Sequence, residues 1–499
     1  MTEQEFNQLA RQGYNRIALS SQALADLETP LSLYLKLVPR GPAGRHSFLL
    51  ESVVGGERFG RYSFIGLPAR TLLRAKDGVT EVLREGEVVE RSDDNPLDFI
   101  DAFYRRFKVA LPAGMPRFCG GLAGYFGYDA ARYIEPRLAR SARRHPKPDP
   151  IGLPDILLLL TEELAVIDNL SGRLHLIVYA DPAQPGAYAS AQARLQALRA
   201  QLRNPVQAPE LTPEEVTPVQ REFDKADYLR AVAVAKDYIA AGDYMQVQIG
   251  QRLRKAYSQP PLSLYRALRA LNPSPYMYFY DFGDHQVVGS SPEILVRQER
   301  TPAGQKVTIR PLAGTRARGQ TPELDAANEA ELLADPKERA EHLMLIDLAR
   351  NDIGRITRTG SVKVTEAFAI ERYSHVMHIV SNVEGVLRDG MDAMDVLRAT
   401  FPAGTLSGAP KIRAMEVIDE LEPSRRGLYG GAVGYWSFAG DMDLAIAIRT
   451  GIVKQGTLYV QAAAGIVADS VPEMEWRETE VKARAVLRAA EQVQEGLDG

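Results

Sequence analysis

Two acidic pairs have the residue types and the spacing to bind a metal ion. Glu338 and Glu341 begin one expected helix, and Glu475 and Glu478 begin another. Residues three apart share one face of a helix, so each pair presents two carboxylates together. If the two faces meet, they offer only hard oxygen donors, and Mg²⁺ prefers such donors.

The residues before each pair are typical of helix starts. Asp335 suits the N-cap and Pro336 the first helical position, and Ser470 precedes the second helix as a capping residue. The run 343–349 is apolar nearly all round, which predicts that the first helix is buried. Charges at the start of a buried helix need a partner or a metal.

Simpler roles for the same glutamates remain open. Glu338 stands where a capping box places a carboxylate, and Glu478 stands four residues before Lys482, the spacing of an ordinary ion pair. Spacing alone does not separate these roles from metal binding.

Composition bounds the class of protein. The chain has 499 residues, of which 45% are hydrophobic and 25% charged, as in a large globular protein. A net charge of −4 argues against general nucleic-acid binding. The single cysteine, Cys119, excludes a disulfide within the chain and fits a reducing compartment. The N-terminus lacks the apolar core of a secretory signal, so we expect a cytoplasmic protein.

A proline- and glutamate-bearing segment at 204–220 is the best candidate boundary, which predicts regions 1–220 and 221–499. A polar helical lead-in is expected over 1–30, followed by short alternating strands and one long apolar strand at 155–167. Helices and strands then alternate irregularly, which indicates an α+β fold with large sheets.

Six glycine-, polar- and aromatic-rich segments follow the boundary. Each alone is a weak signal, because glycines at turns are more often structural. In this order, and with both glutamate helices, they closely resemble the chorismate-utilising enzymes over residues 225–485. The resemblance implies large antiparallel sheets flanked by helices. The segments are 289–293, 310–316, 376–381, 401–411, 429–435 and 461–470.

Two positions select among the branches of this family. Ala313 stands where members that form aminodeoxychorismate carry a lysine nucleophile, and an alanine cannot attack the ring. Gln246 stands where members that form isochorismate or salicylate carry a lysine that activates water, and an amide is a poor base. The chain is therefore most similar to the branch that forms anthranilate and pyruvate from chorismate and ammonia, through an aminodeoxyisochorismate intermediate, in tryptophan biosynthesis.

A further set of residues is similar to the tryptophan feedback site of that branch. Glu51 is expected to meet the ligand's ammonium group, and the segment 275–277 to pack on its indole. Without the family, core strands would be the better interpretation of both segments. The expected tryptophan-binding residues are Leu50, Glu51, Ser52, Pro275, Tyr276, Met277, Val433 and Tyr435.

The resemblance also assigns the metal. It implies Mg²⁺ bound directly by Glu341 and Glu478, with Glu338 and Glu475 acting through water or through the direct ligands. Mg²⁺ on the ring carboxylate of chorismate would withdraw charge and orient the ring.

The substrate contacts follow from the same resemblance. Tyr429 and Arg449 are expected to bind the enolpyruvyl carboxylate, although Arg449 alone suggests no more than a rim salt bridge. His378 is expected beside the departing hydroxyl, as a general acid or hydrogen-bond donor, with Thr405 bonding the same group. The remaining expected substrate-binding residues are Gly314, Thr315, Ala464, Gly465 and Lys482.

One residue departs from the family pattern. Ala463 occupies a position where glycine is expected, which makes close approach of a substrate harder. The base that would remove the ring proton in the second step is not identified by any motif.

The source of ammonia points to a partner. Release of ammonia from glutamine needs an activated thiol, and Cys119 lies in an apolar strand without a neighbouring histidine. We therefore expect a separate glutamine amidotransferase subunit. Two alternatives stay open: an enzyme that forms aminodeoxychorismate, and a catalytically inactive tryptophan-sensing scaffold.

Overall fold

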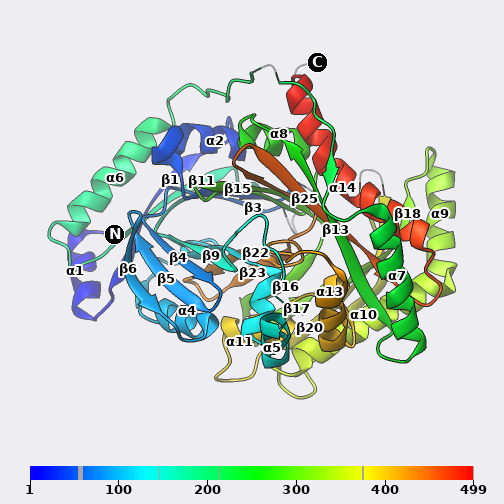
Figure 1. The fold of residues 1–499 in the computed structure, drawn as a ribbon. Helices are drawn as coiled ribbons and strands as arrows, with labels where there is room; N and C mark the ends of the chain where they lie inside the picture. The colour runs from blue at the N-terminus through cyan, green and yellow to red at the C-terminus, as the bar shows by residue number, and fades with distance from the viewer. Residues whose placement is uncertain (54–59, 145, 213, 374–375, 498–499) are drawn as a thin grey trace.

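Two large β-sheets pack face to face, and strands from both halves of the chain build each of them (Figure 1). The structure is a computed structural model that describes residues 1–53, 60–144, 146–212, 214–373 and 376–497. Within these residues every strand pair is antiparallel except β1 with β7, in agreement with the α+β, antiparallel fold expected from the sequence.

The first sheet carries the strands that flank the expected substrate-binding residues. β13 pairs with β25 along ten residues, so hydrogen bonds join these two strands over this whole length. In spatial order the strands are β12 (Gln220–Arg221), β13 (Gln246–Ala256), β25 (Thr457–Ile466), β24 (Thr450–Lys454), β15 (His285–Ser291), β14 (Tyr276–Asp281), β2 (Ser47–Glu51), β3 (Tyr62–Gly66), β10 (Glu163–Asp168), β11 (Arg173–Ala180), β1 (Arg16–Leu24) and β7 (Val109–Ala110), with β21 (Gly408–Ala409) beside β13.

The second sheet contains the strand that carries His378 and, paired with it, the strand that carries Gly314. In spatial order its strands are β18 (Leu312–Ala317), β20 (Val376–Val386), β17 (Gly304–Ile309), β16 (Ile294–Thr301), β23 (Met442–Ile446), β22 (Ala432–Ser437), β8 (Gly121–Phe126), β9 (Ile156–Thr161), β4 (Thr71–Lys76), β5 (Val79–Arg84) and β6 (Glu87–Ser92), with β19 (Lys363–Arg372) beside β20.

Helices flank the sheets. In Figure 1, α8 and α14 lie across the sheet that contains β13 and β25, and α10 lies beside β18 and β20. The helices are α1 (Glu3–Arg11), α2 (Pro30–Leu37), α4 (Pro96–Tyr104), α5 (Pro136–Arg144), α6 (Ala187–Gln201), α7 (Lys225–Ala240), α8 (Pro261–Leu271), α9 (Pro322–Ala334), α10 (Pro336–Gly354), α11 (Ala393–Thr400), α12 (Gly404–Ser407), α13 (Lys411–Leu421) and α14 (Pro472–Glu495), with 3₁₀ turns η1 (Gly41–Gly44) and η2 (Tyr128–Tyr133). None of the helices in the described part of the chain is long and apolar enough to cross a bilayer.

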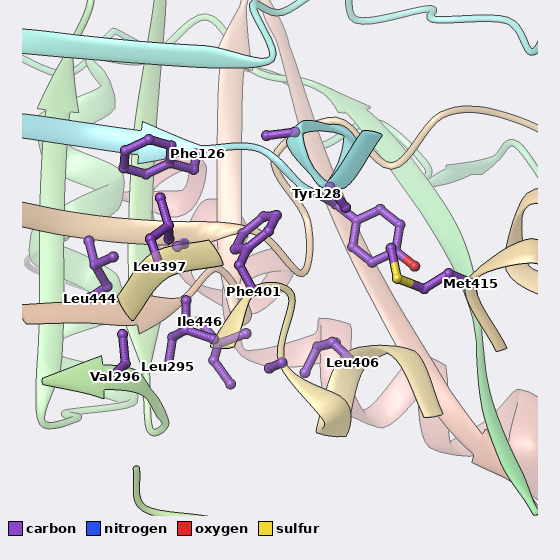
Figure 2. Close-up of a cluster of buried hydrophobic side chains, with 14 of the residues drawn as sticks. Phe126, Tyr128, Leu295, Val296, Leu397, Phe401, Leu406, Met415, Leu444 and Ile446 are labelled. Carbon is purple, nitrogen blue, oxygen red and sulfur yellow. The ribbon is translucent and has the colours of Figure 1, made fainter. Parts of the chain in front are cut away.

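The hydrophobic core does not stop at the predicted boundary. One cluster of buried side chains contains residues of β4, β8 and α4 together with residues of α7, α11 and α13 (Figure 2). The segment 204–220 leads from α6 to β12, so the division at residue 220 remains a prediction about the chain and not about separate cores. The active-site half is thus supported by the N-terminal half.

Two expectations about the strands of the N-terminal half were wrong. Residues 1–30 contain the strand β1 in addition to the helix α1. The long strand expected at 155–167 is two strands, because β9 ends at Thr161 in the second sheet and β10 begins at Glu163 in the first. The residues before Thr161 and after Glu163 are apolar, so the sequence pattern alone does not show that the chain passes from one sheet to the other between them.

The helix α10 starts as expected but is not buried all round. The Asp335 carboxylate accepts the backbone N–H groups of Lys337 and Glu338 at 2.9 and 3.2 Å, and Pro336 is the first helical residue. Leu343 is 58% exposed, because only one face of the helix packs on the sheet. The helix α14 is capped by Val471 without a side-chain hydrogen bond, so the expected capping role of Ser470 was also wrong.

Candidate active site

The first acidic pair lies at the N-terminal end of α10, facing β13 and β18. The Gln246 amide donates to the Glu341 carboxylate at 3.2 Å, and Arg316 pairs with Glu338 at 3.2 Å. Burial raises the pKa of Glu338, Arg316 opposes the rise, and the charge of Glu341 adds to it. The two carboxylates are therefore close enough to repel each other.

The second acidic pair lies at the start of α14. Lys482 pairs with Glu478 at 2.6 Å, as the ordinary i, i+4 interpretation expected. Burial raises the pKa of Glu475, a hydrogen bond with Ser470 opposes the rise, and the charge of Glu478 adds to it. The charge of Lys337, at the start of α10, also lowers the pKa of Glu475, so the N-terminal turns of the two helices face each other.

The donor set fits a hard divalent cation. The four carboxylates already attract cationic side chains, Arg316 at one pair and Lys482 at the other, which shows a local demand for positive charge. Among the described residues, no three histidine, cysteine, aspartate or glutamate side chains form a ready-made metal cage. The four carboxylates offer oxygen donors only, which is the donor type that Mg²⁺ prefers.

A glycine at a β-bulge positions the predicted histidine. The pairing of β18 with β20 shifts register at Gly314, whose φ is +70°, and Thr315 is then opposite His378. A side chain at Gly314 would meet Leu332 and the Glu338 carboxylate at 3.1 and 3.2 Å. Only glycine satisfies both the left-handed backbone and this close approach.

The hydrogen bonds of His378 fix its protonation pattern. Its Nδ1 lies 3.0 Å from the Gly314 carbonyl oxygen and 3.0 Å from the Thr315 hydroxyl. A carbonyl only accepts, so Nδ1 carries the proton and donates it, and Nε2 of the neutral ring is left as an acceptor. Burial lowers the pKa of His378 to about 4. In the protein without substrate the ring is therefore neutral near pH 7, and Nε2 can accept a hydrogen bond but has no proton to donate as the predicted general acid.

A partly buried arginine, Arg449, lacks a carboxylate partner among the described residues. Arg449 follows β23, and its guanidinium forms no ion pair with any residue in the described ranges. Burial lowers the pKa of Arg449, whereas the nearby Tyr429, Glu478 and Glu293 raise it. Tyr429 is also buried, which raises its pKa to about 12. A desolvated cation beside a phenol donor is a suitable site for a carboxylate.

The structure accommodates Ala463, which replaces the glycine of the family pattern, because the residue opposite it is Gly250. Ala463 is buried in β25 without a left-handed backbone and lies opposite Gly250 in β13. A Cβ on Gly250 would lie 3.3 Å from the Ala463 methyl, so the glycine on the adjacent strand provides the room. The Ala463 carbonyl accepts a hydrogen bond from Lys482 at 2.9 Å.

The next residues of β25 meet β13 closely. Gly465 is opposite Gln248, and a Cβ there would lie 2.8 Å from the Gln246 amide nitrogen. Ala464, its neighbour, is fully buried opposite Ile249. Gly465 is therefore the residue whose backbone the two glutamines approach, in line with its expected place at the substrate carboxylate.

The sequence motifs did not reveal Glu293 as a functional residue. It follows β15 and is 7% exposed, and burial raises its pKa to about 8, with Thr405, Lys482 and Arg449 opposing the rise. The Thr405 hydroxyl is buried and has no partner within hydrogen-bond geometry in the described chain. A carboxyl that keeps its proton at neutral pH is a proton donor. In the sequence, the only sign that Glu293 belongs to the site was its place at the end of the segment 289–293.

All eight residues expected at a tryptophan site line one cavity. They are contributed by β2, β14 and β22 and the residues next to them: Leu50, Glu51, Ser52, Pro275, Tyr276, Met277, Val433 and Tyr435.

The charge of Glu51 is already balanced. Its carboxylate accepts two hydrogen bonds from the Arg269 guanidinium, at 2.7 and 3.1 Å, and one from the Tyr265 hydroxyl. A second acidic group at the cavity, Asp443, accepts Arg297 at 2.9 Å and Tyr276 at 3.0 Å. A ligand ammonium would therefore join an existing ion-pair network and would not meet a bare carboxylate.

The single thiol lies away from these groups. Cys119 is fully buried, and burial raises its pKa, so the reactive thiolate is disfavoured. The Tyr179 hydroxyl donates to the Cys119 carbonyl at 2.8 Å. The structural role expected for Cys119 agrees with this environment.

Known proteins resemble the whole chain. The profile of a family described as "chorismate binding enzyme" matches residues 45–488. Proteins named anthranilate synthase component 1 are 59% identical in Neisseria meningitidis serogroup A over 100% of both chains, and 56% identical in Pseudomonas putida over 98% of both. The protein of that name from Aquifex aeolicus is 48% identical over 98% of this chain and 97% of its own length.

Solved structures agree. The crystal structure of anthranilate synthase component I from Streptococcus pneumoniae TIGR4 superposes with a TM-score of 0.76 at 37% identity, over 93% of this chain and 99% of the other. The menaquinone-specific isochorismate synthase of Escherichia coli shares the fold, with a TM-score of 0.72 at 19% identity over 97% and 98% of the two chains. Because the profile match and the full-length relatives agree, the chain belongs to the chorismate binding enzyme family.

Proposed function

We propose that this chain converts chorismate and ammonia to anthranilate and pyruvate. Ammonia adds at ring carbon C2, the C4 hydroxyl leaves as water, and the aminodeoxyisochorismate formed loses its C2 proton and pyruvate to become aromatic. The full-length relatives named anthranilate synthase component 1 support this reaction. So does the absence of a lysine at Ala313 and Gln246.

The observation that carries the proposal is the partly buried, desolvated Arg449, which has no ion-pair partner among the described residues. An uncompensated buried cation is costly, and an anionic substrate removes that cost. Arg449 and Tyr429 bind the enolpyruvyl carboxylate, and the backbone near Gly314 and Gly465 receives the ring carboxylate. Lys482, held by Glu478 and the Ala463 carbonyl, adds positive charge on the same side.

Glu341 and Glu478 would hold Mg²⁺, supported by Glu338 and Glu475. When bound, the ion supplies charge withdrawal through the ring carboxylate. Binding would release the cationic side chains that now pair with these carboxylates, because a divalent ion competes with them for the same oxygens.

Protons move through this chain's own residues. Glu293, protonated at neutral pH, donates to the departing C4 hydroxyl, which Thr405 helps to orient. His378 accepts a hydrogen bond at Nε2, while Nδ1 donates to the Gly314 carbonyl. The reaction needs no thiol, in agreement with the buried Cys119.

Ammonia comes from a glutamine amidotransferase subunit in this proposal, with ammonium salts as a substitute in vitro. Tryptophan occupies the cavity formed by β2, β14 and β22 as a feedback inhibitor. A cytoplasmic location follows from the same chemistry, since the one cysteine leaves no disulfide within the chain.

The test is the purified chain with chorismate, Mg²⁺ and an ammonium salt. We expect anthranilate fluorescence and one pyruvate for each anthranilate, inhibition by tryptophan, and no product with glutamine as the only nitrogen source. An aminated ring that keeps its enolpyruvyl group would mean that the chain forms aminodeoxychorismate. Tryptophan binding without any turnover would identify a sensing scaffold.

A further inference from the structure

A fully buried ion pair lies directly behind the candidate active site. Glu422 follows α13 and Arg426 lies four residues later, and they are 3% and 2% exposed. Arg426 Nε donates to Glu422 Oε2 at 3.0 Å and Nη2 to Oε1 at 2.6 Å. This two-point geometry orients the plane of the guanidinium.

The remaining donors of Arg426 reach backbone carbonyls on two other elements. Nη1 donates to the Leu406 carbonyl at 2.6 Å in α12, and Nη2 donates to the Gln248 carbonyl at 3.0 Å in β13. Glu422 accepts the Gly250 N–H at 2.7 Å, so the pair holds β13 at two points. A single side chain thus ties two segments that are far apart in the sequence.

Each of these carbonyls is one step from an expected substrate contact. Leu406 directly follows Thr405, and Gln248 is opposite Gly465 in the β13–β25 register. The Leu406 side chain packs in the core cluster, so the segment is fixed on its apolar side as well (Figure 2).

The guanidinium also lies between two tyrosine rings. Its carbon is 4.6 Å from the centre of the Tyr128 ring and 5.7 Å from that of Tyr429. Tyr128 belongs to η2 in the N-terminal half and packs in the core cluster, so a residue of that half contacts the guanidinium (Figure 2). The charge of Arg426 also lowers the pKa of Tyr429 against the effect of burial, which makes the phenol a better donor.

A purely structural role would not require these partners. Buried ion pairs contribute little net stability compared with apolar residues of the same volume. We propose that Arg426, oriented by Glu422, is a positioning residue that aligns Thr405, Tyr429 and the strand opposite Gly465 for the substrate. The inference rests on the proposed function, because it takes Thr405 and Tyr429 as substrate contacts.

The conservative variant Arg426→Lys tests it. Lysine keeps the charge but cannot reach Glu422 and both carbonyls with one ammonium group. We expect kcat/KM for chorismate to fall about 10- to 100-fold, because loss of alignment by about an ångström has effects of this size. Glu422→Gln, which keeps the shape of the side chain and removes its charge, is the second variant and should lower kcat/KM in the same direction.

A thermodynamic cycle separates positioning from stability. Arg426→Lys is combined with Thr405→Val and with Tyr429→Phe, and kcat/KM is measured for all combinations. If Arg426 acts through these residues, its effect shrinks to less than about threefold once they are removed. The melting temperature change should be the same in every background. Equal effects on kcat/KM in all backgrounds would overturn the inference.

Arg16→Lys is the matched control. Arg16 also pairs with carboxylates, donates to a backbone carbonyl and lies over an aromatic ring, with Glu162, Asn15 and Phe107 as partners. It lies in β1, outside the candidate site, so kcat/KM should stay within about twofold. If the wild-type chain gives no product, the proposed function fails by itself. The same cycle is then read from chorismate dissociation constants by calorimetry, where additive effects would overturn the positioning role.

Discussion

At the residue scale, the candidate site depends on a partly buried cation and on a buried carboxyl group that stays neutral. Arg449 has a guanidinium without a carboxylate partner among the described residues, and Glu293 is a carboxyl that burial keeps protonated near neutral pH. Groups of this kind cost stability in the free protein and are retained where they act on a ligand. Each therefore predicts a different response to neutral substitution.

Arg449→Gln should weaken substrate binding without weakening the fold. Removing an uncompensated, partly buried charge leaves the free energy of unfolding unchanged or raises it by up to about 1 kcal/mol. Losing the charge-assisted contact should raise KM for chorismate about 10- to 100-fold. Urea denaturation and steady-state kinetics check the two effects. A large loss of stability with unchanged KM would show that Arg449 has an unrecognised structural partner.

Glu293→Gln should remove the proton donor. The pKa of Glu293 is raised to about 8, so the carboxyl is protonated below that pH, and wild-type kcat should fall as pH rises through it. The variant should lose about 10²-fold or more in kcat and also lose this alkaline limb. Kinetics between pH 6 and pH 9.5 measure both.

The same variant predicts a stability effect. With its pKa raised from 4.5 to about 8, Glu293 binds a proton more tightly in the folded state. Wild-type stability from this group is therefore lost as pH rises through that window, and Glu293→Gln should remove the loss. Glu299→Gln, farther along β16 and paired with Arg117 and Lys306, is the control and should keep the wild-type pH dependence of kcat. A Glu293→Gln enzyme with an unchanged alkaline limb would exclude Glu293 as the donor.

At the scale of elements, the β-bulge in β18 connects α10, which carries two of the expected metal ligands, with β20, which carries His378. Gly314 lies against Leu332, Glu338 and Ile379, and its carbonyl accepts His378 Nδ1. The bulge is thus the place where α10 and β20 are set relative to each other. A change there affects both the expected metal ligands and the histidine.

Gly314→Ala should therefore destabilise the protein and impair catalysis. The left-handed φ of +70° and contacts of 3.1 to 3.3 Å predict a loss of about 2–4 kcal/mol, together with a lower kcat. Gly360→Ala is the matched control, because its φ is +78° and nothing lies within 4 Å of the added methyl. It should cost only about 1 kcal/mol and leave kcat unchanged. Equal losses for both would show that the surroundings of Gly314 are not restrictive.

The β13–β25 pair predicts that the unusual alanine is the better residue in this chain. Ala463→Gly removes a buried methyl that fits against Gly250, and it adds a flexible residue to a strand. The free energy of unfolding should fall by about 1 kcal/mol, and KM for chorismate should stay within about twofold. A clear fall in KM would mean that the methyl obstructs the substrate.

Sequence patterns predicted local elements better than their assignment to sheets. The start of α10 at Asp335 and Pro336 followed from capping preferences, which act within one turn. The step from β9 to β10 did not, because both strands are apolar and only long-range pairing decides which sheet each joins. The exposure of Leu343 was not predicted for a similar reason, because the sequence of a helix does not show which of its faces another element covers.

At the scale of the molecule, the candidate site and the cavity lined by the residues expected to bind tryptophan depend on the same two sheets. β16 and β23 carry Arg297 and Asp443 at the cavity, and the chain beside their ends carries Glu293 and Arg449 at the site. The Ile446 N–H donates to the Glu293 carbonyl at 3.0 Å, so these two ends are joined directly. The structure places the eight residues that the family resemblance named around one cavity, and their role as a tryptophan site remains a prediction. The ion pair that balances the charge of Glu51 was not predictable from the sequence.

This arrangement predicts that ligand binding at the cavity survives loss of the metal site. Glu341→Ala should lower turnover more than 100-fold, because it removes an expected direct ligand of Mg²⁺. Tryptophan binds only the folded protein, so it should raise the melting temperature equally in the wild type and in Glu341→Ala. Tyr276→Ala, within the cavity, should abolish that shift. Turnover retained by Glu341→Ala would exclude this glutamate as a metal ligand, and a tryptophan shift lost in Glu341→Ala alone would show that the two sites are not independent.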